Sequence, residues 1–575
     1  MDYHEKYNQW LNSPYLSDDA KAELLSISAN EEEIQDRFYK DLEFGTAGLR
    51  GKIAMGTNRM NIYTVGKTTQ GLANYLLREV GNAKDRGVAI AYDCRHKSRV
   101  FSERAARVLT ANGIKVYLFE DMRPTPELSF AVNHMHAAAG IVITASHNPP
   151  EYNGYKVYSD NAAQILPEVA EQIVEQINQV QDESEVKLIS LKKAEENKLL
   201  HIIGEDIDRI YYQKVKQLSL SDKNDLDPEV KIVYTPLHGT GNIPIRTVLR
   251  EMGFKNVFVD EEQARPDPEF STVKSPNPEN PEAFQRAVEL GKKVHADILI
   301  ATDPDCDRIA VAVLQKNNYV FLNGNQTGAL LLEYILSRRE QNSRLPQESF
   351  AIKTIVTSEI GRAIADNYQV QMIDTLTGFK FICNKAMELE RKGGVFIFGY
   401  EESIGYLTGN FVRDKDAVMS AMLIVEMTAY YKKKGLTLLD ILDQLYQQNG
   451  YFLEHLESIY LEGMEGEQQM KKMMDAFREK FPEISEMKIA KKIDYETSFQ
   501  VDYEKNQEEI IDIPQSDVLK CVFSDGSWYA IRPSGTEPKI KIYMSLKGKD
   551  KQESEAKLAR IKSVIFNKIN QLIHL

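Results

Sequence analysis

Three aspartates on alternate positions form the stretch of the sequence that points most clearly to chemistry. Asp303, Asp305 and Asp307 follow the apolar run 298–300 almost directly. Carboxylates this close together repel one another unless a cation neutralises them, and their oxygens suit a hard divalent metal. The apolar run is typical of a buried strand. We therefore expect the acidic cluster at a strand's carboxyl end, where open α/β sheets bind ligands.

Two other interpretations of this acidic loop are weaker. An EF-hand loop requires Gly at its sixth position and a bidentate Glu at its twelfth, where this sequence has Arg308 and Leu314. A solvated acidic turn is the second alternative, and the position beside a buried strand argues against it. Cys306 is interpreted as a small packing residue, because a soft thiolate does not suit Mg²⁺.

A second loop, residues 144–150, also follows an apolar run and contains Ser146 beside His147. A serine hydrolase would need Gly at positions 144 and 148, where this chain has Thr and Asn, so that class is disfavoured. A serine that carries a phosphoryl group, with the metal of the acidic loop bound to its phosphate, unites the two loops in one site. Mg²⁺ commonly bridges carboxylates and phosphate oxygens in this way.

Two further loops carry groups that suit a sugar phosphate. In the loop 532–538, Arg532 offers a planar fork for a phosphate, Ser534 and Thr536 offer hydroxyls, and Gly535 allows close approach of the backbone. An ordinary turn is the alternative there. In the loop 399–405, paired acids and a serine suit sugar hydroxyls, although acids in the first turn of a helix are the favoured explanation on physical grounds alone. The segment 61–68 resembles a phosphate-binding P-loop but lacks the first Gly, so no ATP site is inferred.

Composition limits the class of protein. The 575 residues carry a formal net charge of −14, which argues against a nucleic-acid or membrane-surface binder. The four cysteines are far apart, so neither a disulfide scaffold nor a zinc site is expected. The polar first residues do not resemble a signal peptide, and no apolar run approaches the roughly 20 residues of a membrane span. We expect a cytoplasmic protein of several domains.

The elements that must position these loops alternate along the chain. Strands are predicted at 87–93, 139–144, 230–234 and 394–398, and helices at 68–80, 102–112, 281–293, 328–338 and 417–433. This alternation favours α/β layers. Residues 181–199 are predicted to form a linker or surface hairpin. After Gly450 the pattern predicts a different domain, with longer acidic and Met-rich helices and fewer strands.

In chain order, the segments TASHNP, DPDCDR, GYEESIG and RPSGTEP resemble the four signature loops of the α-D-phosphohexomutase superfamily. The resemblance extends from about residue 43 to about residue 545 and is greatest to the bacterial α-phosphoglucomutases. It implies an α/β fold of three domains with mixed sheets and a C-terminal α+β domain around a central cleft. We expect these four domains at residues 1–205, 206–322, 323–450 and 451–575.

The resemblance also implies roles for individual residues. Ser146 would be the phosphorylated serine, and with Asp303, Asp305 and Asp307 it would bind Mg²⁺. Arg308, which closes the acidic loop, is a candidate for charge stabilisation. The predicted substrate-binding residues are Glu401 and Ser403 for the sugar hydroxyls, and Arg532, Ser534, Gly535 and Thr536 for the phosphate that does not react.

Further matches to the superfamily are less specific. Arg50, in the loop 44–50, would face the reacting phosphate, and Lys156 matches a proposed acid/base group. His147 is the other candidate for moving the hydroxyl proton, and the residues do not choose between the two. Additional ligand-facing positions would be Thr377, Gly378, Lys380 and Lys415. Tyr400 departs from the pattern of many glucomutases, which leaves the preferred sugar open.

Together these residues predict a phosphoglucomutase that works through a phosphoserine and a glucose 1,6-bisphosphate intermediate, with Mg²⁺. A phosphopentomutase or a phosphomannomutase would use the same loops. An Asp-nucleophile phosphatase would not require Ser146, and an inactive sugar-phosphate sensor would tolerate its loss. The expected partners are sugar phosphates, with neither nucleic acid nor membrane, and nothing in the sequence indicates an oligomeric state.

Overall fold

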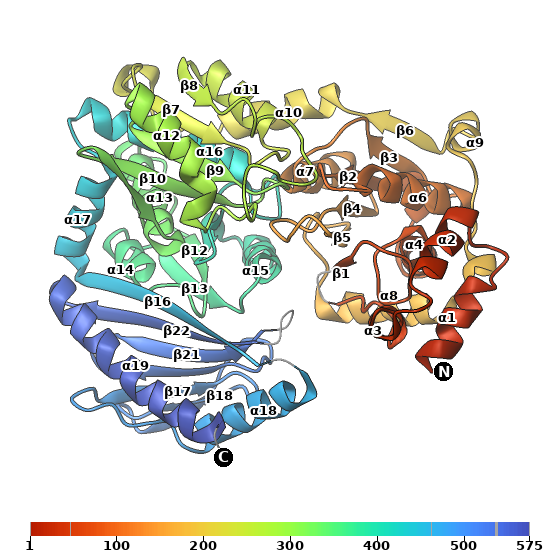
Figure 1. Ribbon diagram of the computed structural model, residues 1–575. Coiled ribbons are helices and arrows are strands. Elements are labelled where there is room, and N and C mark those ends of the chain that lie inside the picture. The colour runs from red at the N-terminus through yellow and green to blue at the C-terminus, as the bar shows by residue number, and fades with distance from the viewer. Residues whose placement is uncertain (1, 46–47, 462, 535–538, 574–575) are drawn as a thin grey trace. The chain divides into compact units, whose positions relative to one another are not determined.

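The computed structural model describes residues 2–45, 48–461, 463–534 and 539–573 (Figure 1). Its contacts divide the chain into two compact units. The first unit comprises residues 1–323, 386–388 and 403–435, and the second comprises residues 324–385, 389–402 and 436–575. Each unit contains two sheets, so each is described in turn.

The first sheet of unit 1 is mixed and six-stranded, in the order β1-β5-β4-β2-β3-β6. Strands β2, β3, β4 and β6 run parallel, whereas β5 runs antiparallel to β4 and to β1. Its strands are β1 (Leu49–Lys52), β2 (Val88–Tyr92), β3 (Val116–Phe119), β4 (Ala139–Ile143), β5 (Tyr152–Ser159) and β6 (Leu200–Ile203). Residues in β2 and β4 are buried throughout, as expected for central strands covered by helices.

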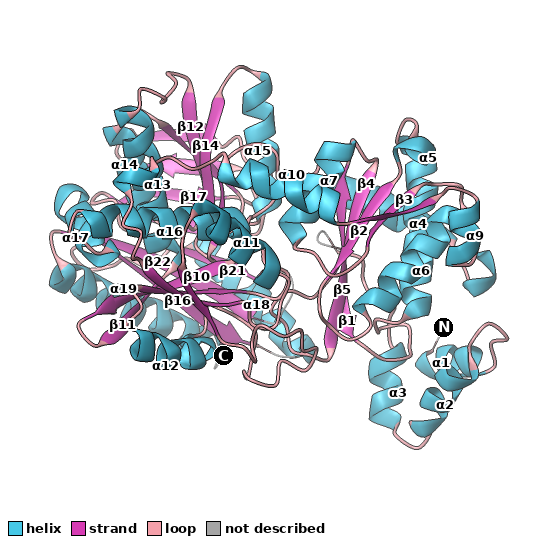
Figure 2. Cartoon of the chain, turned by 90° about the horizontal axis from the view of Figure 1, so that it is seen from above, coloured by secondary structure: helices cyan, strands magenta, loops and turns pink. Residues whose placement is uncertain are grey.

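The helices of this region form two groups. Three short N-terminal helices pack together around their own apolar cluster, which includes Leu24 and Phe38 (Figure 2). They are α1 (Tyr3–Leu11), α2 (Asp18–Ser26) and α3 (Glu31–Phe38). The remaining helices are α4 (Ile62–Glu79), α5 (Ala83–Arg86), α6 (Ser98–Ala111), α7 (Thr125–Met135), α8 (Pro167–Gln179) and α9 (Leu191–Glu196). Because α9 packs against α6 and Ala194 is buried, the expectation of a linker or hairpin at 181–199 is wrong.

The second sheet of unit 1 is also mixed, in the order β11-β10-β9-β7-β8. Strands β7, β8 and β9 run parallel, and the antiparallel β9–β10 hairpin holds the acidic loop at its turn. The strands are β7 (Lys231–Thr235), β8 (Asn256–Val259), β9 (Ile298–Thr302), β10 (Ile309–Gln315) and β11 (Asn318–Leu322). The remaining elements of the unit are α10 (Glu205–Lys216), α11 (Asn242–Met252), α12 (Gln285–Val294), β15 (Gly405–Leu407) and α16 (Ala417–Lys433).

The first sheet of unit 2 contains three parallel strands in the order β13-β12-β14. Their bounds are β12 (Ser349–Thr354), β13 (Gln371–Thr375) and β14 (Val395–Glu401). The helices nearby in sequence are α13 (Gly324–Gln341), α14 (Ile360–Asn367), α15 (Phe379–Arg391) and α17 (Leu438–Asn449). The crossover helix between two parallel strands explains the strand–helix alternation read from this part of the sequence.

The C-terminal part of unit 2 is a seven-stranded antiparallel sheet in the order β16-β22-β21-β20-β17-β18-β19. Its strands are β16 (Tyr451–Tyr460), β17 (Ile489–Asp494), β18 (Phe499–Asp502), β19 (Gln507–Ile510), β20 (Leu519–Phe523), β21 (Trp528–Pro533) and β22 (Lys539–Gly548). Helices α18 (Gly463–Glu479) and α19 (Lys551–Ile573) pack on it, and α19 crosses β16 and β22 (Figure 1). The expectation of fewer strands here is wrong, whereas the α+β class is confirmed.

The structure therefore confirms the predicted fold class, with α/β layers followed by a C-terminal antiparallel sheet. The predicted strands at 87–93, 139–144, 230–234 and 394–398 correspond to β2, β4, β7 and β14. Helix α4 begins at Ile62, earlier than predicted, because Asn61 caps it by accepting hydrogen bonds from the N–H groups of Tyr63 and Thr64. Within the described residues, no helix is both long and apolar enough to cross a membrane.

Candidate active site

The three aspartates of the acidic loop meet at the turn of the β9–β10 hairpin in unit 1. Asp303 and Asp305 are fully buried and Asp307 is 2% exposed. One carboxylate oxygen from each lies within 4.8 Å of the others. Asp303 Oδ1 accepts hydrogen bonds from the backbone N–H groups of Asp307 and Arg308, at 3.2 and 3.0 Å. The local hairpin geometry thus turns the carboxylates toward a common point.

The carboxylate oxygens of this cluster are suited to bind a divalent cation. Asp305 Oδ1 and Asp307 Oδ1 are buried and, among the described residues, accept no hydrogen bond. A buried carboxylate oxygen without a partner is costly unless a cation compensates it. Burial and the neighbouring Asp305 raise the pKa of Asp303 well above its usual value. An oxygen-only donor set with this much negative charge suits a hard cation such as Mg²⁺.

Ser146 reaches this cluster from the end of β4. Its hydroxyl donates a hydrogen bond of 2.6 Å to Asp303 Oδ2, and its Oγ lies 3.2 Å from Nδ1 of His147. Ser146 adopts a left-handed backbone conformation with φ of +51°. This conformation is uncommon for a residue other than glycine and is concentrated at functional sites. The structure therefore brings together the two loops that the sequence linked only by chemistry.

Arg95 holds the serine loop in place and was not found from the sequence. Its guanidinium is buried and donates to the backbone oxygens of Ser146 at 2.6 Å and Pro149 at 2.8 Å, and also to Asn148. The Nε of Arg95 lies 3.3 Å from the buried carboxylate of Asp93. A planar fork with several fixed donors is suited to fastening an irregular loop in this way. In the sequence, Arg95 lies in a polar loop far from the motif.

Two lysines face the acidic cluster. Lys156, on β5, lies 2.7 Å from Asp305 and 3.5 Å from Asp307. Lys415 lies 3.2 Å from Asp307. Burial opposes the charge of Lys156, but Asp305 and Asp307 outweigh it and raise the pKa of the ammonium. Burial likewise opposes ionisation of Asp305, and the ammonium of Lys156 lowers the pKa of that carboxyl nevertheless.

Two arginines and the histidine complete the charged surroundings in unit 1. Arg50 is exposed to solvent and donates a 3.2 Å hydrogen bond to Asn148 Oδ1, in the serine loop. Arg308 lies 4.0 Å from Glu279 and 3.9 Å from Asp307. Desolvation, with the positive charges of Arg308 and Arg50, lowers the pKa of His147 well below its usual value. A cationic rim around a buried acidic centre is suited to an anionic substrate.

Ser403 also belongs to unit 1 and lies near the acidic loop along the backbone. The backbone N–H of Ile309, at the start of β10, donates to the oxygen of Ile404 at 3.2 Å. Ser403 is half-buried. The segment 402–404 is a turn between strands β14 and β15, so the alternative of a helix N-terminus at this motif is wrong.

The other predicted sugar-binding residues lie in unit 2, at the carboxyl ends of its parallel strands. Thr377 and Gly378 follow β13, and Gly378 has φ of +114°, a conformation that favours glycine. Lys380 is 9% exposed, and Glu401, at the end of β14, is 5% exposed. The neighbouring Glu402 accepts hydrogen bonds from the hydroxyls of Thr354 and Thr357. The loops after β13 and β14 therefore start from the same edge of one sheet, on either side of β12.

Tyr400 does not belong to this surface. Its side chain is fully buried and fills the space beside Gly328 and Gly361, where an added Cβ would lie 2.2 and 2.1 Å from Tyr400 atoms. Tyr400 is therefore a packing residue under the helices α13 and α14. The structure removes the one feature of the sequence that pointed to a pentose.

The predicted phosphate loop connects β21 and β22. Arg532 is half-buried near the end of β21, and the backbone N–H of Ser534 donates to the oxygen of Lys539 at 2.8 Å. Gly535 and Thr536 lie outside the described residues. The strands β21 and β22 on either side of it pair antiparallel.

Comparison with known proteins identifies the family. Residues 41–184, 206–316 and 323–448 match the models of the alpha/beta/alpha domains I, II and III of phosphoglucomutase/phosphomannomutase, and residues 481–563 match the model of its C-terminal domain. The chain belongs to the phosphoglucomutase/phosphomannomutase family. A phosphoglucomutase from Staphylococcus aureus (strain MRSA252) is 40% identical over 538 residues, which cover 93% of this chain and 94% of the relative.

Solved structures of the phosphoglucomutase/phosphomannomutase family share the fold. The open form of parafusin, a phosphoglucomutase from Paramecium, matches with a TM-score of 0.67 at 18% identity and covers 93% of this chain and 96% of its own. N-acetylphosphoglucosamine mutase from Aspergillus fumigatus, in complex with GlcNAc-6P and magnesium, matches with a TM-score of 0.52 at 12% identity over 97% of this chain and 99% of its own. At these identities the likeness concerns the fold alone.

Proposed function

We propose that this protein interconverts glucose 1-phosphate and glucose 6-phosphate through a phosphoserine at position 146. The observation that carries the proposal is the 2.6 Å hydrogen bond from the Ser146 hydroxyl to Asp303, inside a buried group of three carboxylates. A hydrolase would need a base and an oxyanion hole around the serine. Here His147 lies beside the serine, but the serine hydroxyl donates its hydrogen bond to an acid of the buried cluster, an arrangement that suits a phosphoryl carrier beside a cation. The relatives named phosphoglucomutase support glucose as the sugar.

The proposed reaction exchanges phosphoryl groups between the serine and the sugar. The bond between Ser146 Oγ and phosphorus breaks, and the free hydroxyl oxygen of the hexose phosphate forms a new bond to that phosphorus. The hydroxyl proton passes to a base, and glucose 1,6-bisphosphate results. The other phosphate of this bisphosphate then returns to Ser146 Oγ, which releases the isomeric monophosphate and restores the phosphoserine.

Asp303, Asp305 and Asp307, with the phosphorylated Ser146, would hold Mg²⁺. When bound, this ion supplies positive charge that offsets the negative charge on the transferring oxygens. The protein adds its own cations: Lys156 and Lys415 contact the carboxylates directly. Fixed charges of this kind act without reorganisation during the reaction.

The hydroxyl proton has two candidate acceptors, and their positions differ. His147 Nδ1 lies 3.2 Å from Ser146 Oγ, whereas Lys156 Nζ lies 2.7 Å from Asp305. We assign the main charge-balancing role to Lys156, because its ammonium joins the serine loop's sheet to the acidic loop, and we keep both Lys156 and His147 as candidates for the proton transfer. Arg50, which contacts Asn148 of the serine loop, is assigned to the reacting phosphate, and Arg308 to charge stabilisation.

The remaining substrate-binding residues are assigned from the loops that resemble the family's signature loops. We assign the sugar hydroxyls to Glu401 and Ser403, and assign Glu402 a supporting role because two threonines already occupy its carboxylate. The distal phosphate is assigned to the hairpin tip that contains Arg532. The complete set of proposed substrate-binding residues is Thr377, Gly378, Lys380, Glu401, Ser403, Lys415, Arg532, Ser534, Gly535 and Thr536.

The test joins an activity assay with a measurement of the phosphoserine. Conversion of glucose 1-phosphate is followed by coupled detection of glucose 6-phosphate, with and without a glucose 1,6-bisphosphate primer. Ser146→Ala should lower kcat by at least about a thousandfold without unfolding the protein, because it removes the phosphoryl acceptor and little packing. Mass spectrometry should find phosphate on the peptide that contains Ser146. Activity that persists in Ser146→Ala would refute the mechanism.

Sugar preference needs a parallel series. The kcat/KM for glucose 1-phosphate should exceed that for mannose 1-phosphate, ribose 1-phosphate and deoxyribose 1-phosphate. A site that hydrogen-bonds sugar hydroxyls discriminates against analogues that lack them, because its polar groups are then left unpaired. A pentose that is turned over faster would transfer the protein to the phosphopentomutases, and lack of turnover on every sugar would indicate a sugar-phosphate sensor.

A further inference from the structure

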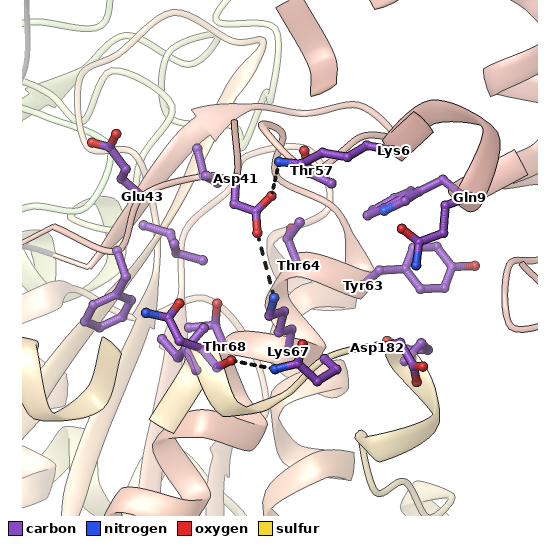
Figure 3. Close-up of a pocket in the computed structure, with 18 of the residues that line it drawn as sticks. Lys6, Gln9, Asp41, Glu43, Thr57, Tyr63, Thr64, Lys67, Thr68 and Asp182 are labelled. Atoms are coloured by element: carbon purple, nitrogen blue, oxygen red, sulfur yellow. Dashed lines mark hydrogen bonds and ion pairs between the residues drawn. The ribbon is translucent and has the colours of Figure 1, made fainter. Parts of the chain in front are cut away.

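A cavity of about 460 Å³ lies in unit 1, beside the N-terminal helices (Figure 3), and its lining includes no residue of the acidic loop. Its volume falls within the range of small-molecule sites. Helix α1 forms one wall with Lys6, Gln9 and Trp10, which recur at the three- and four-residue spacing of one helix face. Helices α4 and α8 form others, and residues 41–44, Leu49 and residues 181–183 also line the cavity.

The α4 wall contains the segment that resembles a P-loop in the sequence. Thr64, Lys67 and Thr68 face the cavity from within a regular helix, which cannot wrap around a phosphate as a P-loop does. The function of this polar face is not accounted for by the reaction at Ser146. The cavity therefore combines a recognisable polar motif with a location outside the proposed active site.

Both lysines that line the cavity are already paired with the same carboxylate. Asp41 lies 2.9 Å from Lys6 and 3.8 Å from Lys67, and Figure 3 shows it between the two ammonium groups. The other acids exceed the cations: Glu43, Asp182 and Glu183 also line the cavity. An anionic ligand would have to break the pairs of Asp41 and approach these carboxylates. Sugar phosphates and nucleotides are thereby disfavoured.

The remaining lining groups favour a ligand with many hydrogen-bond donors. Carboxylate and amide oxygens, such as those of Asp41 and Asn178, accept hydrogen bonds from hydroxyl groups. The half-exposed Trp10 and the neighbouring Tyr63, with ring centroids 5.9 Å apart, provide apolar ring surface. We propose that this cavity binds an uncharged saccharide and that its occupancy regulates the enzyme.

The route from the cavity to the active site is short. Phe44 and Leu49 line the cavity, and Arg50 follows directly in β1. Gly45 and Gly48 exchange two backbone hydrogen bonds of 3.0 Å, which ties the two ends of this segment together. Arg50 in turn contacts Asn148 of the serine loop at 3.2 Å. A ligand against Phe44 and Leu49 therefore acts on the strand that positions Arg50.

Binding can be measured without activity, because the chain contains only two tryptophans. Trp10 lines the cavity, whereas Trp528 is 1% exposed in the C-terminal sheet. Titration with maltose should change the fluorescence saturably, with a half-point at or below about 1 mM, and Trp10→Phe should abolish the change. Glucose 6-phosphate should give no such Trp10 signal. A stronger signal from glucose 6-phosphate or adenosine than from maltose would overturn the assignment to an uncharged saccharide.

A matched pair of variants on α8 locates the site. Asn178→Phe fills the cavity from an exposed position, and Gln172→Phe places the same side chain on the outward face of that helix. Maltose should bind Gln172→Phe as it binds the unmodified protein, and its affinity for Asn178→Phe should fall at least about tenfold. Equal binding to both variants would refute the site. The fluorescence result stands independently of the proposed mutase reaction.

Regulation is tested separately, and this part rests on the proposed function. Saturating maltose should change kcat/KM for glucose 1-phosphate at least about twofold in the unmodified protein and in Gln172→Phe, but not in Asn178→Phe. Binding without any change in kcat/KM would refute the coupling to Arg50. Lack of turnover in all three proteins would contradict the mutase assignment and leave the binding measurement intact.

Discussion

Lys520 provides the sharpest test of the charge balance in unit 2. It lies on β20 with its side chain 5% exposed, and its ammonium donates a 2.7 Å hydrogen bond to the backbone oxygen of Ile355. Its Nζ is also 3.6 Å from Glu359 and 4.2 Å from the ring centroid of Trp528. These contacts join the C-terminal sheet to the segment that follows β12. Lys520→Met removes the charge and keeps most of the volume.

The size of the expected change in the free energy of unfolding follows from the pKa of Lys520. Burial lowers the pKa of Lys520 to about 8 from its ordinary 10.5, although Glu359 opposes the shift. Below pH 8 the folded protein must hold a buried ammonium, which costs on the order of 3 kcal/mol. Between these two pKa values the unfolded chain binds the proton and the folded chain does not. The contribution of Lys520 to the free energy of unfolding therefore rises with pH through this window.

The expected result is a difference in pH dependence. From about pH 7.5 to about pH 9.5, the stability of the unmodified protein should rise relative to Lys520→Met by about 2 kcal/mol. Urea unfolding in a Trp10→Phe background reports this directly, because Trp528 is then the sole tryptophan and lies beside Lys520. The control is Lys491→Met, since Lys491 lies in the same sheet but is one-third exposed.

Two results would refute this reasoning. A stability difference between the unmodified protein and Lys520→Met that stays constant over this pH range would mean that Lys520 releases no proton on folding. An equal pH-dependent difference for Lys491→Met would assign the effect to the sheet as a whole. If the stability difference instead fell with pH, the pKa of Lys520 would have to lie above its ordinary value. The ion pair with Glu359 would then outweigh burial.

Three further predictions concern the candidate active site. Asp305→Asn should raise the Mg²⁺ concentration needed for half-maximal activity by about tenfold or more, and an unchanged metal titration would contradict the metal assignment. Arg95→Met should destabilise unit 1 by about 3–5 kcal/mol in urea unfolding, because Asp93 is left buried and unpaired. Asp93→Asn combined with Arg95→Met should recover part of that loss. Lys156→Met should lower kcat by about a hundredfold and His147→Gln by about tenfold, and the reverse order would make His147 the main acid/base group.

Local patterns in the sequence singled out the acidic loop and the serine loop, and the structure brings their side chains together. The aspartates recur at alternate positions next to an apolar strand, and Ser146 follows a strand in the same way. Each signal lies within one loop, and the ends of parallel strands meet at one edge of a sheet. The hydrogen bond from Ser146 to Asp303 connects residues 157 positions apart, and no local sequence pattern predicts it. The domain boundaries at residues 205, 322 and 450 stay a prediction.

The predictions failed where polar residues occupy regular structure. Strands β18 and β19 have only four residues each, and β19, with Gln507, Glu508 and Glu509 in succession, lacks the apolar alternation that identifies a strand. Strand β18 pairs with its chain neighbours β17 and β19, and only β17 connects these strands to β20 and the rest of the sheet. Helix α9 was missed for a similar reason, since it buries little more than Ala194 along a charged segment. Tertiary contacts decided the structure in both places.

Arg95 and Tyr400 show why residue type alone misled in opposite directions. Arg95 is a charged residue in a polar loop, which usually indicates solvent exposure, yet its guanidinium is buried under the serine loop and fastens its backbone oxygens. Tyr400 stands inside a functional motif, yet its ring packs against two glycines behind the sheet. Because successive residues of a strand point to opposite faces, Tyr400 and Glu401 must face different surroundings. The pleat of β14 thus directs Tyr400 into the core and turns Glu401 to the opposite face, which is the face that we propose for the sugar.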